Sequence, residues 1–147
     1  MESKFNFKSS VCTSCEQSER LLALGLKKET ADMKYLGTRE YYGGVLTEGM
    51  SSVPMIIDTE DDDVTEYDIP AWSLHRLWEL TPKVIFTKPS LYLTMCEDSV
   101  FYCAEGNNEE YEKSFSRQIS LYDNIIDCIE SLIKEGNFNE EYLERKE

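Results

Sequence analysis

The sequence has no long hydrophobic run, and it has few positive charges for its size. No stretch approaches the roughly 20 apolar residues of a membrane-spanning helix, so we expect no such helix. Residues 1–10 contain two lysines but no apolar segment, and we therefore expect no signal peptide. Only 15 basic residues stand against 29 acidic ones, which gives a net charge of −14. Because like charges repel, this balance disfavours direct binding to nucleic acid or to anionic lipid.

Linkers and repeats are also missing. The chain has four prolines and seven glycines, without a Pro- or Ser-rich segment or an internal repeat, so no domain boundary is predicted. Its 147 residues are enough for one domain with a real core, and we expect a single domain over residues 1–147. Nine Tyr, six Phe and two Trp argue against global disorder. Only the first ten residues or so are expected to be disordered.

Recognisable catalytic motifs are absent as well. The sequence has no Walker loop, GxGxxG, HExxH or GxSxG. His75 is the only histidine, so a Ser–His or Cys–His nucleophile would have to use it. It lies early in a predicted helix beside the buried face, where a structural or surface histidine is far more common. We therefore expect no catalytic constellation and no cofactor.

The clearest predicted element is a C-terminal amphipathic helix over residues 120–135, with Gly136 placed to end it. Polar residues, Asn124 and Asp127 among them, fall on the opposite arc. Its apolar residues fall on one arc, which is typical of a core face: Leu121, Tyr122, Ile125, Ile126, Ile129, Leu132 and Ile133.

Two further helices are predicted upstream. Ser14 and Gln17 have the spacing of a capping box, and Gly25 is placed to stop the helix that they begin. A second helix is expected to start at Asp68, with Pro70 near its first position. Short helical turns are expected over residues 29–33 and 140–145.

Strand signals are short. Residues 35–52 and 107–116 are predicted to be irregular, with Gly43 and Gly44 as a turn. Four runs favour strands, with residues 96–99 as a hairpin turn between the last two: residues 53–57, 84–86, 91–95 and 100–103. The predicted class is α+β, a small, mostly antiparallel sheet packed against two to four helices.

The pair Cys12 and Cys15 is the first candidate site. A CxxC before a helix is where a redox pair would lie, because the helix N-terminus stabilises a thiolate. Pro54, in the segment Ser-Val-Pro-Met-Ile, resembles the Val-Pro segment that faces the CxxC in glutaredoxins and thioredoxins. However, residues 4–8 are too polar for a central buried strand, and here a helix precedes the hairpin instead of following it. The alternative is two ordinary thiols.

Metal binding is not predicted. Cys96 and Cys103 are seven apart and form no second zinc knuckle beside the CxxC. Cys128 lies at the edge of the apolar arc, as a core residue would. The total of five cysteines is odd and fits a reducing compartment, so a cytoplasmic location is expected.

An acidic run occupies residues 58–68. Aligned as an EF-hand, it has Asp63 where glycine is needed and Ile69 where glutamate closes the loop, so the calcium pattern fails. A solvated acidic loop is preferred. Its carboxylates remain a candidate binding patch: Asp58, Glu60, Asp61, Asp62, Asp63 and Glu66.

Three segments, in this order, resemble a family of small hypothetical proteins carried by Bacteroidetes bacteria and by their phages and mobile elements. They are residues 15–26 with 29–33 (CEQSERLLALGL and ETADM), residues 70–74 (PAWSL) followed by Leu77 and Pro82, and residues 127–136 (DCIESLIKEG). The family has no assigned activity, so no functional residue is carried over. The resemblance implies a mobile-element origin and a cytoplasmic setting.

These observations favour a non-catalytic accessory or interaction protein of a phage or mobile element, with a basic host or phage protein as its partner. One alternative is a thiol–disulfide redox protein that uses Cys12 and Cys15. Another is an acidic polyanion mimic that inhibits a host nucleic-acid-binding protein.

Overall fold

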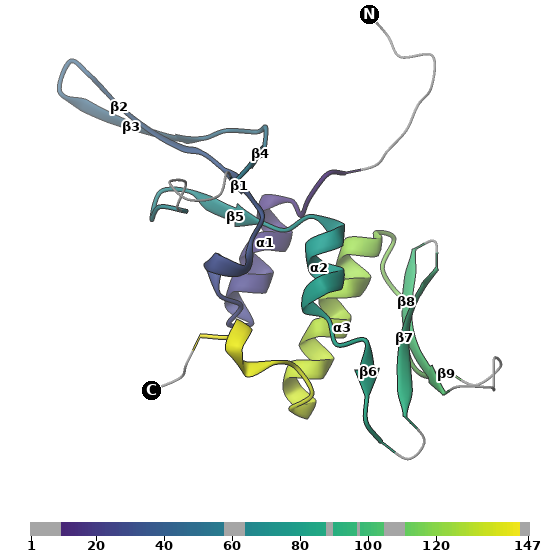
Figure 1. Cartoon of the computed structure of the whole chain (residues 1–147). Coiled ribbons are helices and arrows are strands. Elements are labelled where there is room, and N and C mark those ends of the chain that lie inside the picture. The colour runs from purple at the N-terminus through teal and green to yellow at the C-terminus, as the bar shows by residue number, and fades with distance from the viewer. Residues whose placement is uncertain (1–9, 58–63, 88–89, 97, 105–110, 145–147) are drawn as a thin grey trace, which may run out of the picture.

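The computed structural model describes residues 10–57, 64–87, 90–96, 98–104 and 111–144 (Figure 1). This part of the chain contains three α-helices and three small antiparallel sheets, so the predicted α+β class is confirmed. The strands are divided among separate sheets instead of the single sheet that we expected. Residues 1–9, which belong to the N-terminal segment that we predicted to be disordered, lie outside the described residues.

Helix boundaries follow local capping. The helices are α1 (Cys15–Ala23), α2 (Leu74–Leu80) and α3 (Leu121–Glu135), with short 3-10 helices at Lys28–Thr30 and Glu140–Tyr142. Ser14 and Gln17 form the predicted capping box of α1, and Ser73 and Ser120 cap α2 and α3. Gly136 adopts a left-handed conformation, φ +75°, and ends α3 as predicted.

The strands form three units. A three-stranded sheet has the order β4-β1-β5, from Met55–Ile56, Met33–Tyr35 and Ile69–Ala71. A two-stranded hairpin joins β2 (Gly37–Tyr42) to β3 (Val45–Met50). A four-stranded sheet has the order β6-β7-β8-β9, from Val84–Ile85, Leu91–Cys96, Ser99–Ala104 and Tyr111–Phe115.

Helix α3 lies at the centre of the molecule. It packs against α1 on one side and against β8 and β9 on the other. The predicted apolar arc supplies this contact, since Ile125, Ile126, Ile129 and Leu132 are almost completely buried. Trp72, which follows β5, joins the same core. In Figure 1 the four-stranded sheet lies on one side of the helices, whereas the β2–β3 hairpin extends away from them.

Asn124 was predicted to lie on the polar arc of α3, and that assignment is wrong. The side chain is fully buried. Its amide donates to the backbone carbonyls of Asp98 and Gln118, and its carbonyl oxygen accepts from the Gln118 N–H at 3.0 Å. A buried polar group is tolerated when it is hydrogen-bonded in this way.

Three predictions of secondary structure are corrected. Residues 111–115 form β9 instead of a loop, and residues 37–50 form the β2–β3 hairpin instead of an irregular segment. The segment after Asp68 is strand β5, and α2 begins only after Ser73. Pro70 pairs with Lys34 in β5, an edge strand, where a residue without an N–H does not break the ladder of a central strand.

Candidate interaction surface

The β2–β3 hairpin carries the most concentrated group of exposed apolar side chains among the described residues. Tyr41, Tyr42 and Val45 are 71%, 68% and 65% exposed, and Leu46 is also exposed. We call these four residues the hairpin tip. Exposed apolar side chains gathered at one end of an element make that end a candidate interaction site.

A tight turn forms the tip. Gly43 and Gly44 have φ of +56° and +82°, as a type I′ turn requires at both central positions. In the resulting register Tyr42 pairs with Val45 and Tyr41 pairs with Leu46. Cross-strand partners share a face and successive residues alternate between faces, so each face of the hairpin carries one apolar pair.

The base of the hairpin is fixed to the body. A Cβ on Gly37 would overlap the backbone carbonyl of Tyr67, so only glycine allows this approach. The Gly37 N–H donates to Asp68 Oδ1 at 3.0 Å, and the Thr65 N–H donates to Asp68 Oδ2 at 3.1 Å. Lys34 Nζ lies 3.8 Å from the same carboxylate, and both of these side chains are almost buried.

Further exposed residues surround this base. The exposed apolar residues here are Met50, the last residue of β3, and Leu36, Val53 and Ile56 on the segments that lead into and out of the hairpin. A hollow of about 420 Å³ lies beside them, with two carboxylates in its wall. It is lined by Gly37, Thr38, Glu48, Gly49, Met50, Glu66 and Tyr67. Apolar and acidic groups therefore occur together at the base.

The surroundings of the predicted redox pair, Cys12 and Cys15, raise the pKa of both thiols, whereas those of a reactive thiol lower it. Cys12 is buried, and its Sγ lies 3.6 Å from Tyr35 Oη. Burial raises the pKa of the Cys12 thiol; the Tyr35 hydrogen bond opposes this, and the nearby Asp32 and Cys15 raise the pKa further. Burial and Glu19 raise the pKa of Cys15. Catalytic thiols have a lowered pKa, so these raised values argue against a nucleophile at neutral pH.

Most of the candidate acidic patch lies outside the described residues, namely Asp58, Glu60, Asp61, Asp62 and Asp63. Glu66 is described and is exposed, whereas Asp68 is engaged at the base of the hairpin. Within the described ranges, no cluster of three or more His, Cys, Asp or Glu side chains is arranged to hold a metal ion.

His75 is in contact with solvent, with 82% of its side chain exposed, and Nε2 is 3.4 Å from Glu79. It lines a hollow of about 820 Å³ between the starts of α2 and α3, together with Ser73 and Ser120. Both hydroxyls cap their own helices, and Ser73 Oγ also donates to Asp32 at 2.5 Å. The serines are thus occupied structurally and are not held as nucleophiles by His75.

The other three cysteines are also free thiols. Cys96 is exposed and Cys103 is half-buried, both on the β7–β8 hairpin. Cys128 is completely buried, as predicted for a core residue, and burial raises the pKa of its thiol to about 12.

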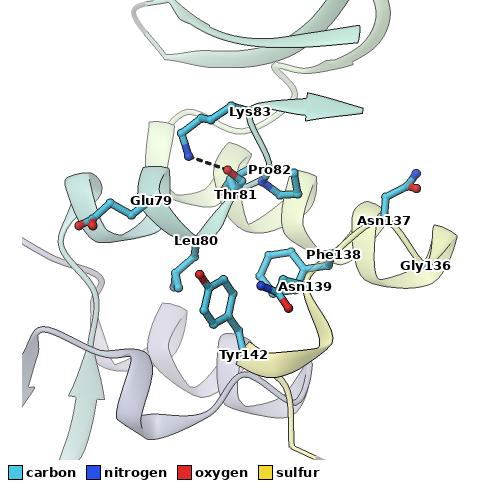
Figure 2. Close-up of a pocket in the computed structure, with 10 residues that line it drawn as sticks. All are labelled: Glu79, Leu80, Thr81, Pro82, Lys83, Gly136, Asn137, Phe138, Asn139 and Tyr142. Atoms are coloured by element: carbon cyan, nitrogen blue, oxygen red, sulfur yellow. Dashed lines mark hydrogen bonds between the residues drawn. The ribbon is translucent and has the colours of Figure 1, made fainter. Parts of the chain in front are cut away.

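A third hollow, of about 380 Å³, lies where the end of α2 meets the end of α3 (Figure 2). Its polar side chains cap the C-terminal end of α2. Lys83 Nζ donates to the backbone carbonyl of Thr81 at 2.7 Å and to that of Trp78, and the Thr81 hydroxyl donates to the Leu77 carbonyl at 2.6 Å. Burial lowers the pKa of Lys83, although the charge of Glu79 opposes this shift. These contacts satisfy the last carbonyls of α2, a capping function.

The hairpin tip was therefore not predicted from the sequence. Its available signal was the pair Gly43-Gly44 between two six-residue runs that contain aromatic and β-branched residues.

Where the chain is described, no helix has the length and apolar character needed to cross a membrane. No family model matches the chain, and neither a curated protein nor a solved structure shows significant similarity to it.

Proposed function

We propose that this chain is a non-catalytic interaction protein that binds another protein through the hairpin tip. The observation that carries the proposal is the exposure of Tyr41, Tyr42, Val45 and Leu46 at the end of an ordered, projecting hairpin. The proposed mobile-element origin would fit such an accessory role.

Folding does not account for these side chains. The tip belongs to neither hydrophobic cluster of the described core, so it contributes no core packing. A partner that covers the tip accounts for their exposure, since each buried tyrosine can remove about 150–250 Å² from water.

The surroundings of the candidate catalytic side chains, the two thiols and the serines near His75, also favour association without catalysis. Both thiols of the predicted redox pair have a raised pKa, and the serines near His75 are engaged as helix caps. The redox alternative keeps the predicted position of Cys15 at the start of α1, but the raised pKa of both thiols disfavours it. Described exposed acids are carried by several elements, among them α1, α2 and the C-terminal segment, which gives the polyanion mimic no single acidic face.

The test compares captures from host lysate by the full chain and by two matched double variants. Y41S/Y42S removes two aromatic groups from the tip, and F86S/I119S removes two apolar groups that are 88% and 98% exposed elsewhere. We expect a partner that the full chain and F86S/I119S retain and that Y41S/Y42S loses.

The captured protein is then purified, and its affinity for all three chains is measured. Loss of one buried aromatic anchor costs about 2 kcal/mol or more, or roughly a 30-fold rise in Kd. Equal affinity of Y41S/Y42S and the unaltered chain would show that the tip is not the binding site.

A further inference from the structure

We infer that the hairpin tip enters a cleft in its protein partner, that the cleft walls contact both faces of the hairpin, and that basic residues surround the cleft mouth. This inference rests on the proposed function and specifies the kind of partner. It follows from the pairing register of the tip and from the charge at its base.

The register places apolar pairs on both faces. Tyr42 and Val45 lie on one face, and Tyr41 and Leu46 lie on the other. A flat partner surface would cover one pair and leave the other in water. Burial of all four side chains requires protein on two sides of the tip, which is the geometry of a cleft. All four are exposed, so none of the described segments of the chain provides that cover.

The hairpin has the reach and rigidity for insertion. Each strand contains six residues, which at about 3.4 Å per residue gives a projection of roughly 20 Å. Gly37 against Tyr67, together with the hydrogen bonds to Asp68, fixes the base. The Ser51 N–H also donates to the Leu36 carbonyl at 2.8 Å, where the chain leaves the hairpin. A hairpin ordered before binding loses less entropy when it binds.

Charge complementarity selects the partner. Glu66 and Glu48, the latter opposite Arg39 in the hairpin register, line the hollow at the base, where the mouth of an enclosing cleft would lie. The whole chain carries −14, so lysine or arginine at that mouth would be attracted and a second copy of this chain would be repelled. The same charge opposes insertion of the tip into an anionic membrane or binding to nucleic acid.

The first experiment places a photo-crosslinking residue, p-benzoylphenylalanine, at each tip position in the full chain, one at a time. The control position is Phe86, which is exposed on a different segment. With the purified partner from the capture experiment, we expect adducts from all four tip positions and none from position 86. Peptide mapping should locate the four adducts on opposing walls of one cleft.

The other possible outcomes contradict, in turn, the cleft, the proposed function and the choice of a basic protein as the partner. Adducts from only one pair, Tyr42 with Val45 or Tyr41 with Leu46, would overturn the cleft and leave the proposed function intact. No tip adducts with a partner that still binds would overturn the proposed function itself. Adducts between two copies of this chain, or flotation of the chain with anionic phosphatidylserine vesicles, would overturn the assignment to a basic protein.

The second experiment tests charge. E48Q/E66Q should slow association with the purified partner by about threefold or more at low salt and leave dissociation nearly unchanged, because peripheral charges mainly steer encounter. The association rate of the unaltered chain should fall as NaCl is raised. The control is E16Q/E141Q, which removes the same charge from exposed positions on other elements. Equal slowing by both variants, or no slowing by either, would overturn the basic mouth.

Discussion

Asp68 is a nearly buried carboxylate whose partners keep it charged. Burial by itself raises its pKa. The Gly37 and Thr65 hydrogen bonds and the ammonium of Lys34 outweigh that effect, so the pKa of Asp68 lies below its usual value. Lys34 is itself buried in β1 and carries its charge into this site. The residue therefore links the hairpin base, the turn before β5 and strand β1.

We expect Asp68→Asn to lower the free energy of unfolding at neutral pH and to flatten its dependence on acid. A carboxylate with a lowered pKa stabilises the fold above its unfolded pKa, about 4, and this contribution disappears as pH falls through the folded pKa. Urea unfolding at pH 7 and near pH 3 measures both effects. Loss of one partner of a buried charge costs about 1–3 kcal/mol or more at pH 7.

Glu66→Gln is the matched control, because Glu66 lies two residues away and is exposed. Its unfolding curves should overlay those of the unaltered chain at both pH values. If Asp68→Asn keeps the same acid dependence as the unaltered chain, the proposed charge state of Asp68 is wrong.

Elements with one buried face were predictable from the sequence, and α3 shows why. Its apolar residues repeat with the helical period because one face packs on the core, and Ser120 and Gly136 fix its ends through local backbone chemistry. Strand β5 was missed because Pro70 suits a helix start as well as an edge strand. Local signals alone do not separate the two.

The hairpin was missed for the opposite reason. Both of its faces are exposed, so its sequence has no alternation between buried and solvent-facing positions. Consequently the tip, as the candidate site, was not predicted, although its turn residues were. The CxxC was predicted as a site because the motif is local, whereas the burial that raises the pKa of Cys12 comes from β1 and β5, distant in sequence.

At the scale of the hairpin, the conformation of Gly43 should control the order of the tip separately from global stability. We expect Gly43→Val to disrupt the turn, because a bulky residue at positive φ costs about 1–2 kcal/mol, and Gly43→Asn to be tolerated. Cross-strand NMR contacts between Tyr42 and Val45 measure the order of the tip.

The urea midpoint should remain unchanged in both variants, because the tip lies outside the two described core clusters. Affinity for the partner should fall for Gly43→Val only. Intact Tyr42–Val45 contacts in Gly43→Val would mean that the turn does not depend on the glycine.

For the whole molecule, the net charge of −14 is the property with the widest effect. Self-repulsion destabilises a compact state, and salt screens it: the Debye length falls from about 30 Å at 0.01 M to about 8 Å at 0.15 M. Salt also screens the attraction within ion pairs, and this lowers stability. Among the described residues, for example, Arg20 pairs with Asp127 at 2.5 Å. With 14 uncompensated charges, we expect repulsion to dominate.

The thermal midpoint should therefore rise by a few degrees over this range of salt, which for a chain of this size corresponds to about 1 kcal/mol. The control is E19Q/D98N/E144Q, which removes three charges at exposed positions on separate segments. Its midpoint should be higher at low salt and should rise less with salt, because the repulsion is already reduced. A midpoint of the unaltered chain that falls with salt would show instead that ion pairs such as Arg20–Asp127 outweigh the repulsion.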